Sequence, residues 1–80
     1  MLRKYVIIKG QPILFSTEII HADVVSKVTD VESAGFFIIT NGDKDKKINV
    51  MCLGESVSLA INSRPEIDEE IIKEFLTLKY

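Results

Sequence analysis

The residues best able to take part in catalysis in this 80-residue chain are its only cysteine, Cys52, and its only histidine, His21. They could act as a nucleophile and base if folding brought them together, because a neighbouring imidazole activates a thiol. Their spacing does not require this. Cys52 lies in an apolar segment, where a thiol stays protonated and inert, and a lone histidine at a helix start fits a cap or a surface residue. The sequence therefore predicts no catalytic site and no enzyme.

Two further motifs have the composition of functional sites but lack their spacing. Gly54-Glu55-Ser56-Val57-Ser58 resembles a nucleophile elbow, but that motif needs glycine at position 58 and a helix after it. "NGDKDKK" offers Asp43 and Asp45 to a cation, but no glutamate closes a calcium loop and three lysines crowd it. One cysteine and one histidine cannot build a tetrahedral metal site alone. We expect no metal and no cofactor.

A polar segment near the C-terminus is the candidate anion-binding or partner-binding surface. Small hydroxyl side chains on a strand that leads into a helix N-terminus could bind an anion through backbone N–H groups and an arginine. The same residues also fit an exposed sheet face followed by a helix cap. The candidate residues are Ser56, Ser58, Ser63 and Arg64, with Asn62 beside them.

Nucleic-acid binding is the alternative function, and it would use the lysine-rich tip of a predicted hairpin. Aromatic side chains could then stack on bases. The net charge of −2 argues against a nucleic-acid partner. Residues 1–53 carry +1 and residues 54–80 carry −3, so neither part of the chain is a basic arm. The residues concerned are Lys44, Lys46 and Lys47, supported by Arg3, Lys4 and Lys9 and by Tyr5, Phe36 or Phe37.

The elements that must position these residues belong to one domain, residues 1–80. With 46% apolar and 28% charged residues the chain is expected to fold. No apolar run reaches the roughly 18 to 20 residues that cross a bilayer, and "YVII" is too short for a signal-peptide core. A single cysteine favours a reducing compartment, so we expect a cytoplasmic protein without a membrane partner.

The segment "KYVIIKGQPILFS" predicts a hairpin near residues 4–15. If Lys9-Gly10 is its two-residue turn, Pro12 lies opposite Ile7, at a position that makes no ladder hydrogen bond. A turn at Gly10-Gln11 would instead need an N–H that Pro12 lacks. We favour the turn at Lys9-Gly10.

The middle of the chain predicts a short helix near residues 21–27 and a second hairpin near residues 34–53. Ile20, Val24 and Val28 recur at helical spacing, and Thr17 or His21 could cap the start. "AGFFIIT" is typical of a central strand, and Asn41-Gly42 is a strong hairpin turn.

A third hairpin is predicted near residues 47–62, with Gly54-Glu55 as a type II′ turn. Its register places Cys52 opposite Val57, Val50 opposite Leu59 and Ile48 opposite Ile61. One surface of the pair is then wholly apolar.

The C-terminal segment predicts a helix over about residues 64–78. Ser63 and Glu66 have the spacing of a capping box, with Pro65 in the first turn and three acidic residues near the positive end of the dipole. Glu69 and Lys73 could pair one turn apart. The apolar stripe consists of Ile67, Ile71, Phe75 and Leu78, widened by Ile72 and Leu76.

The sequence thus predicts an α+β fold, an antiparallel sheet of about five strands with the C-terminal helix packed on one face. Apolar residues on both faces of "YVII" and "FFIIT" indicate association through a sheet edge or face. The predicted function is a small non-catalytic binding or interaction module, whose partner is another protein or a second copy.

Overall fold

The computed structural model describes residues 2–25, 31–41 and 48–79. The fold is α+β, as predicted. Among the described residues, neither helix is long and apolar enough to cross a membrane. The elements are β1 (Leu2–Ile8), β2 (Gln11–Phe15), α1 (His21–Val24), β3 (Val31–Asn41), β4 (Ile48–Leu53), β5 (Glu55–Ser56), β6 (Ile61–Asn62) and α2 (Pro65–Lys79).

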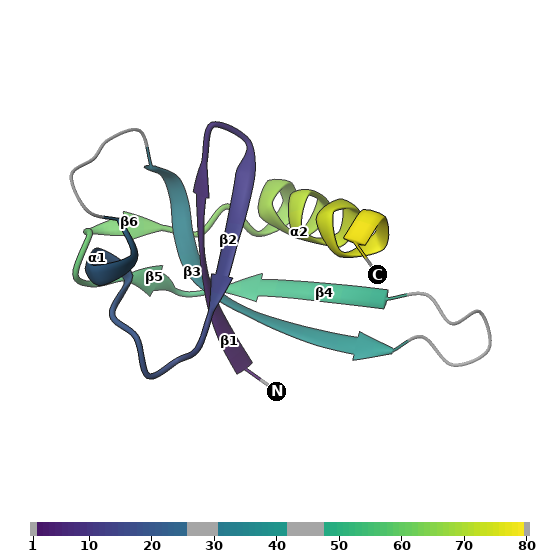
Figure 1. Cartoon of the computed structure of the whole chain (residues 1–80), viewed down its shortest axis with the longest axis horizontal. Coiled ribbons are helices and arrows are strands. Elements are labelled where there is room, and N and C mark those ends of the chain that lie inside the picture. Colours follow the sequence, from purple (N-terminus) through teal and green to yellow (C-terminus); the bar gives the residue numbers. More distant parts are fainter. Residues whose placement is uncertain (1, 26–30, 42–47, 80) are drawn as a thin grey trace.

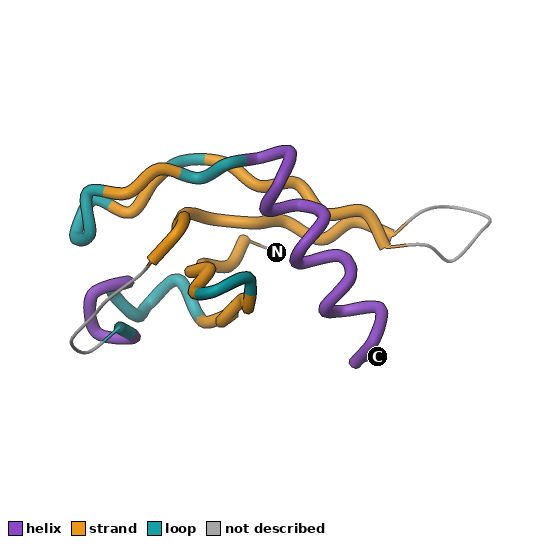
Figure 2. The backbone as a smooth tube through the Cα atoms, turned by 90° about the horizontal axis from the view of Figure 1, so that it is seen from above, coloured by secondary structure: helices purple, strands orange, loops and turns teal. Residues whose placement is uncertain are grey.

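The main sheet has four antiparallel strands in the order β2-β1-β3-β4, and β5 and β6 form a separate two-stranded sheet. Figure 1 shows α1, β5 and β6 gathered at one end of the molecule, away from α2. In the view of Figure 2, α2 crosses over β3 and β4. The side chains of each strand alternate between a face under α2 and the opposite face.

The first hairpin has the predicted turn. Ile7 lies opposite Pro12 and Ile8 opposite Gln11. Lys9 and Gly10 both have positive φ, 51° and 75°, as a two-residue turn of the I′ type requires. Pro12 therefore occupies a position without a ladder bond, and its missing N–H costs nothing there.

β3 is the central strand, as the apolar run "AGFFIIT" predicts. It pairs with β1 on one side and with β4 on the other. The β3–β4 hairpin is confirmed by the pairs from Phe36–Leu53 to Asn41–Ile48. Its predicted lysine-rich tip lies outside the described residues.

The predicted pairing within residues 47–62 is wrong. Cys52 lies opposite Phe37 of β3 rather than opposite Val57, and the short β5–β6 pair joins Ser56 to Ile61. The outer side of β4 is approached by α2, because the Glu69 carboxylate accepts a hydrogen bond from the Cys52 N–H at 3.0 Å. A second strand therefore does not continue the ladder at this position.

Gly35 explains how the chain leaves β4 and passes close to β3. A Cβ atom at Gly35 would lie 2.7 Å from the Leu53 carbonyl oxygen and 3.0 Å from the Cβ of Ser63. Any larger residue would force this crossing apart. Ser63 then secures the return of the chain, since its N–H and its hydroxyl both donate to the Gly54 carbonyl, at 3.1 and 2.7 Å.

The short helix α1 begins at His21 as predicted but is not capped as predicted. Its N-cap residue is Ile20, whose side chain makes no capping hydrogen bond. The His21 ring points into the protein, where it is buried. The end of the predicted helix, residues 26–27, lies outside the described residues.

The C-terminal helix is confirmed, but its start differs from the predicted capping box. The Asp68 N–H donates to the Arg64 carbonyl at 2.8 Å, so Arg64 is the N-cap residue and Pro65 takes the first helical position, which proline favours. Ser63 does not cap the helix, because its hydroxyl donates to the Gly54 carbonyl. The Arg64 N–H donates to the Asp68 carboxylate at 2.8 Å.

The buried side of α2 is rotated from the predicted stripe. Asp68 and Ile72 are fully buried and Leu76 nearly so, whereas Ile67 is 54% exposed and Leu78 80% exposed. Glu69, expected to pair with Lys73, contacts β4 instead. The rotation brings the Asp68 carboxylate to polar partners in the sheet. The predicted stripe was chosen from apolar residues alone and so did not include Asp68.

Candidate interaction surface

The structure places the two residues of the hypothetical catalytic pair on opposite faces of the sheet. Cys52 belongs to the core under α2, with Tyr5 and Phe37. His21 contacts Phe36, the neighbour of Phe37 on β3, from the other side. The two side chains are not brought together.

Both groups are also in their uncharged forms at neutral pH. Burial, aided by nearby carboxylates, raises the pKa of the Cys52 thiol to about 12, which removes the reactive thiolate. Burial lowers the pKa of His21, although its hydrogen bond to Gly35 acts in the other direction. His21 Nε2 lies 3.0 Å from the Gly35 carbonyl oxygen, so this nitrogen must carry the proton.

The polar residues chosen from the sequence do not form one polar surface. Ser56 is fully buried, and its hydroxyl accepts the Leu59 N–H at 3.2 Å and lies 3.4 Å from the Ser58 hydroxyl. The Ser58 hydroxyl accepts the Ala22 N–H at 3.2 Å, which ties α1 to this segment. Ser63 is bound to Gly54, as described above. These hydroxyl groups hold the backbone in place.

Arg64 belongs to a buried polar cluster around Asp68, which the sequence did not reveal. Ser33 donates to Asp68 at 2.7 Å, and the Tyr5 hydroxyl donates to the same carboxylate. Arg64 adds its Nε at 3.2 Å and an ion pair at 3.1 Å. Burial and the bond to Asp68 raise the pKa of Tyr5, so its hydroxyl keeps the proton that it donates. This Asp68 cluster fastens the start of α2 to β1 and β3.

The groups considered for nucleic-acid binding are only partly described. Lys44, Lys46 and Lys47 lie outside the described residues, so their role stays a prediction. Tyr5 and Phe37 are buried under α2 and cannot stack on a base. Arg3 and Lys9 are exposed.

The ammonium group of Lys4 is already engaged within the protein. Its Nζ donates to the Ile19 carbonyl at 2.8 Å and lies 5.7 Å from the centroid of the Phe36 ring. Phe36 therefore carries a cation over one side of its ring and is not a free stacking platform.

A group of exposed apolar side chains lies on the sheet face opposite α2. Leu2, Ile38 and Met51 stand directly opposite one another across β1, β3 and β4, and Leu53 is the next residue along β4 on that face. Leu2 is 42% exposed, Met51 60% and Leu53 40%. We call these four residues the open face.

An apolar groove lies beside the open face, between the sheet and the covering segment formed by α1 and β5. It has a volume of about 330 Å³. Ile20 and Val57 are 52% and 84% exposed. One cation and one anion, Lys4 and Glu55, also line it, together with His21, Phe36 and Ser58.

The open face could have been anticipated only in part. The alternation of apolar residues in β1, β3 and β4 indicated that both faces needed cover. The sequence did not show how far the segment containing α1, β5 and β6 would reach. That segment covers Val6, Phe15 and Ala34 and stops short of the open face.

Comparisons of this chain with protein-family models, curated proteins and solved structures found no match. Within residues 2–25, 31–41 and 48–79, no group of three or more histidine, cysteine or acidic side chains could hold a metal ion. The open face and its groove are the surface on which a functional proposal is built.

Proposed function

We propose that this protein is a small non-catalytic interaction module of the cytoplasm, which associates with a second copy of itself through the open face. The observation that carries this proposal is the exposure of Leu2 on β1 and of Met51 and Leu53 on β4, which lie on the same sheet face on either side of β3. Contiguous exposed apolar side chains are typical of interaction sites. The lone cysteine supports the cytoplasmic assignment.

The chemistry of this surface favours a second copy as the occupant. The four residues of the open face are uncharged, so two copies can meet there without repulsion between like charges. A two-fold axis repeats the same patch on both copies. Two sheets packed face to face, about 10 Å apart, would close the open faces together.

Sedimentation velocity between about 1 and 100 μM protein tests this association, because a micromolar dimer dissociates across that range. We expect the wild-type mass to rise to twice that of the chain. Met51→Lys places a charge in the open face, opposite Ile38, and should keep the chain monomeric. Its exposed position leaves stability within about 0.5 kcal/mol of the wild type.

Thr77→Lys is the matched control, since it adds the same charge at an exposed position on α2. This variant should associate like the wild type. A wild-type chain that stays monomeric at about 100 μM, or a Met51→Lys variant that still forms the dimer, would contradict the proposal.

A further inference from the structure

α2 carries a second apolar line beside the one that packs on the sheet. Successive residues of a helix are turned by about 100°, which separates Ile72 and Leu76 from a flank made of Ile67, Ile71, Phe75 and Leu78. The first two are buried. On the flank, Ile71 and Phe75 are half-buried, and Ile67 and Leu78 are 54% and 80% exposed. The sheet therefore leaves much of this flank uncovered.

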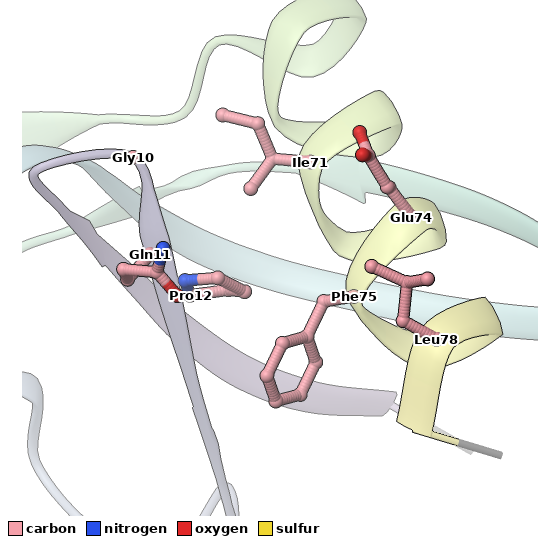
Figure 3. Close-up of a pocket in the computed structure, with 7 residues that line it drawn as sticks. All are labelled: Gly10, Gln11, Pro12, Ile71, Glu74, Phe75 and Leu78. Carbon is pink, nitrogen blue, oxygen red and sulfur yellow. The ribbon is translucent and has the colours of Figure 1, made fainter.

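The flank borders a hollow between the C-terminal half of α2 and the β1–β2 turn. Figure 3 shows Ile71 and Phe75 projecting from the helix toward the hairpin residues Gly10, Gln11 and Pro12. The hollow has a volume of about 200 Å³. A cavity of roughly 150 Å³ holds a benzene ring, so the hollow accommodates one large apolar side chain. We call the hollow and the flank together the helix groove.

Acidic side chains accompany the helix groove along its length. Glu66, Glu70 and Glu74 are exposed at four-residue spacing on α2, and Glu74 lines the hollow itself. On the hairpin side, the exposed Glu32 accepts the Gly10 N–H at 2.6 Å. Lys9 at the tip of the same turn offsets Glu32, so the negative charge of the groove comes chiefly from α2.

This charge excludes some occupants. Glu66, Glu70 and Glu74 are exposed on α2, whereas the buried Asp68 is neutralised by its ion pair with Arg64. A second copy that docked flank to flank would bring the Glu70 and Glu74 rows of both copies together, and like charges repel. Nucleic acids and anionic lipid surfaces are disfavoured for the same reason.

We propose that the helix groove binds an amphipathic, basic helix of a partner protein. One large apolar side chain of that helix enters the hollow against Phe75 and Pro12, and further apolar residues pack on Ile71 and Leu78. Lysine or arginine residues beside them meet Glu70 and Glu74. This is the helix-in-groove mode of recognition, in which apolar anchors recur at helical spacing and charged rims set the choice of partner.

The proposal is independent of the open face, because α2 packs on the opposite face of the sheet. The helix groove should therefore bind its partner equally well in the Met51→Lys variant. A failure of the self-association proposal can in this way be distinguished from a failure of the helix groove to bind its partner.

The test uses two 15-residue peptides of identical leucine and lysine content. In the first, the leucines recur at i, i+3, i+4 and i+7, and in the second their order is scrambled. Binding is followed by amide NMR shifts at low salt. We expect saturable binding of the first peptide, with shifts at Gly10, Gln11 and residues 71–78, and much weaker binding of the second.

Variants on α2 distinguish binding in the helix groove from non-specific attraction of a basic peptide to acidic side chains. Leu78→Ser should weaken binding about tenfold, as loss of an interface anchor does, without affecting a fold in which Leu78 is exposed. Glu74→Lys should weaken binding roughly fivefold, the upper range for an exposed ion pair. Glu66→Lys makes the same charge change two turns away and should have a smaller effect.

Three results would overturn the proposal. These are equal binding of the scrambled peptide, equal weakening by Glu66→Lys and Glu74→Lys, and NMR shifts outside the groove or no shifts at all.

Discussion

The two faces of the four-stranded sheet are built from similar apolar residues but are closed to very different degrees. Under α2, Tyr5 and Phe37 are almost completely buried. On the opposite face Leu2, Met51 and Leu53 are 40–60% exposed. Because neighbouring residues of the same strands contribute to both faces, the hydrophobicity of the strands does not explain the difference.

What differs is how firmly the covering element is attached. α2 is fastened by the Asp68 cluster at its start and by the Glu69 contact to Cys52 further along. The segment on the other face is held to the sheet by single hydrogen bonds, from His21 to the Gly35 carbonyl and from Lys4 to the Ile19 carbonyl, and it covers only part of the sheet. The comparison teaches that the face under α2 has a charged anchor with several hydrogen bonds in addition to its apolar packing.

The substitution with the largest expected effect on the face under α2 is Asp68→Ala. The substitution leaves Tyr5, Ser33 and Arg64 without their shared partner inside the protein. A buried hydrogen-bonding group left without its partner costs about 1–3 kcal/mol, and Tyr5 and Ser33 are both fully buried, so we expect a loss of about 2–5 kcal/mol in urea denaturation. Asp68→Asn, which keeps one acceptor oxygen, should lose less. A loss under about 1 kcal/mol, typical of an ordinary substitution, would show that the Asp68 cluster does not hold α2.

A thiol on each face sharpens the comparison. At pH 8 a Cys52 pKa of about 12 leaves roughly a thousandfold less thiolate than an unperturbed thiol. In Met51→Cys, labelling with a thiol reagent at low protein concentration should show one fast thiol at position 51 and one slow thiol at position 52. Rapid labelling of Cys52 in the folded wild type would contradict closure of the face under α2.

The pH dependence of stability probes the other face. The pKa of His21 is lowered in the folded state, so the unfolded chain binds more protons below its pKa of about 6.5. The stability that His21 contributes is present above that pH and is lost as the pH falls toward the folded pKa. The slope is at most about 1.4 kcal/mol per pH unit. His21→Gln, which can still donate to Gly35, should flatten this slope, and an unchanged slope would assign it to other groups.

The local features of the fold were predictable from the sequence. Pro12 selected the turn at Lys9-Gly10, because a proline tolerates only a position without a ladder bond. The apolar run around Phe36 and Phe37 identified the central strand. Pro65 and the acidic first turn marked the start of α2 within a residue.

The candidate site was less predictable. Ser56 and Ser58 alternate like residues of an exposed strand, but their hydroxyl groups accept N–H bonds of Leu59 and Ala22. Ser58 hydrogen-bonds a residue distant in the sequence, which no local pattern reveals. The sequence indicated an excess of apolar residues on the strands, but it did not show which residues would form the open face.

By itself, the sequence determined the first hairpin with its turn, the central strand and the extent of the C-terminal helix, because these depend on neighbouring residues and on backbone geometry. Only the tertiary structure decided that β4 pairs with β3 and not with β5 among the described strands, that α2 turns Asp68 inward and that its apolar flank faces a hollow. Apolar periodicity allows several registers and rotations of similar burial. The choice among them came from hydrogen-bond partners distant in the chain, since a buried carboxylate such as Asp68 must find its donors.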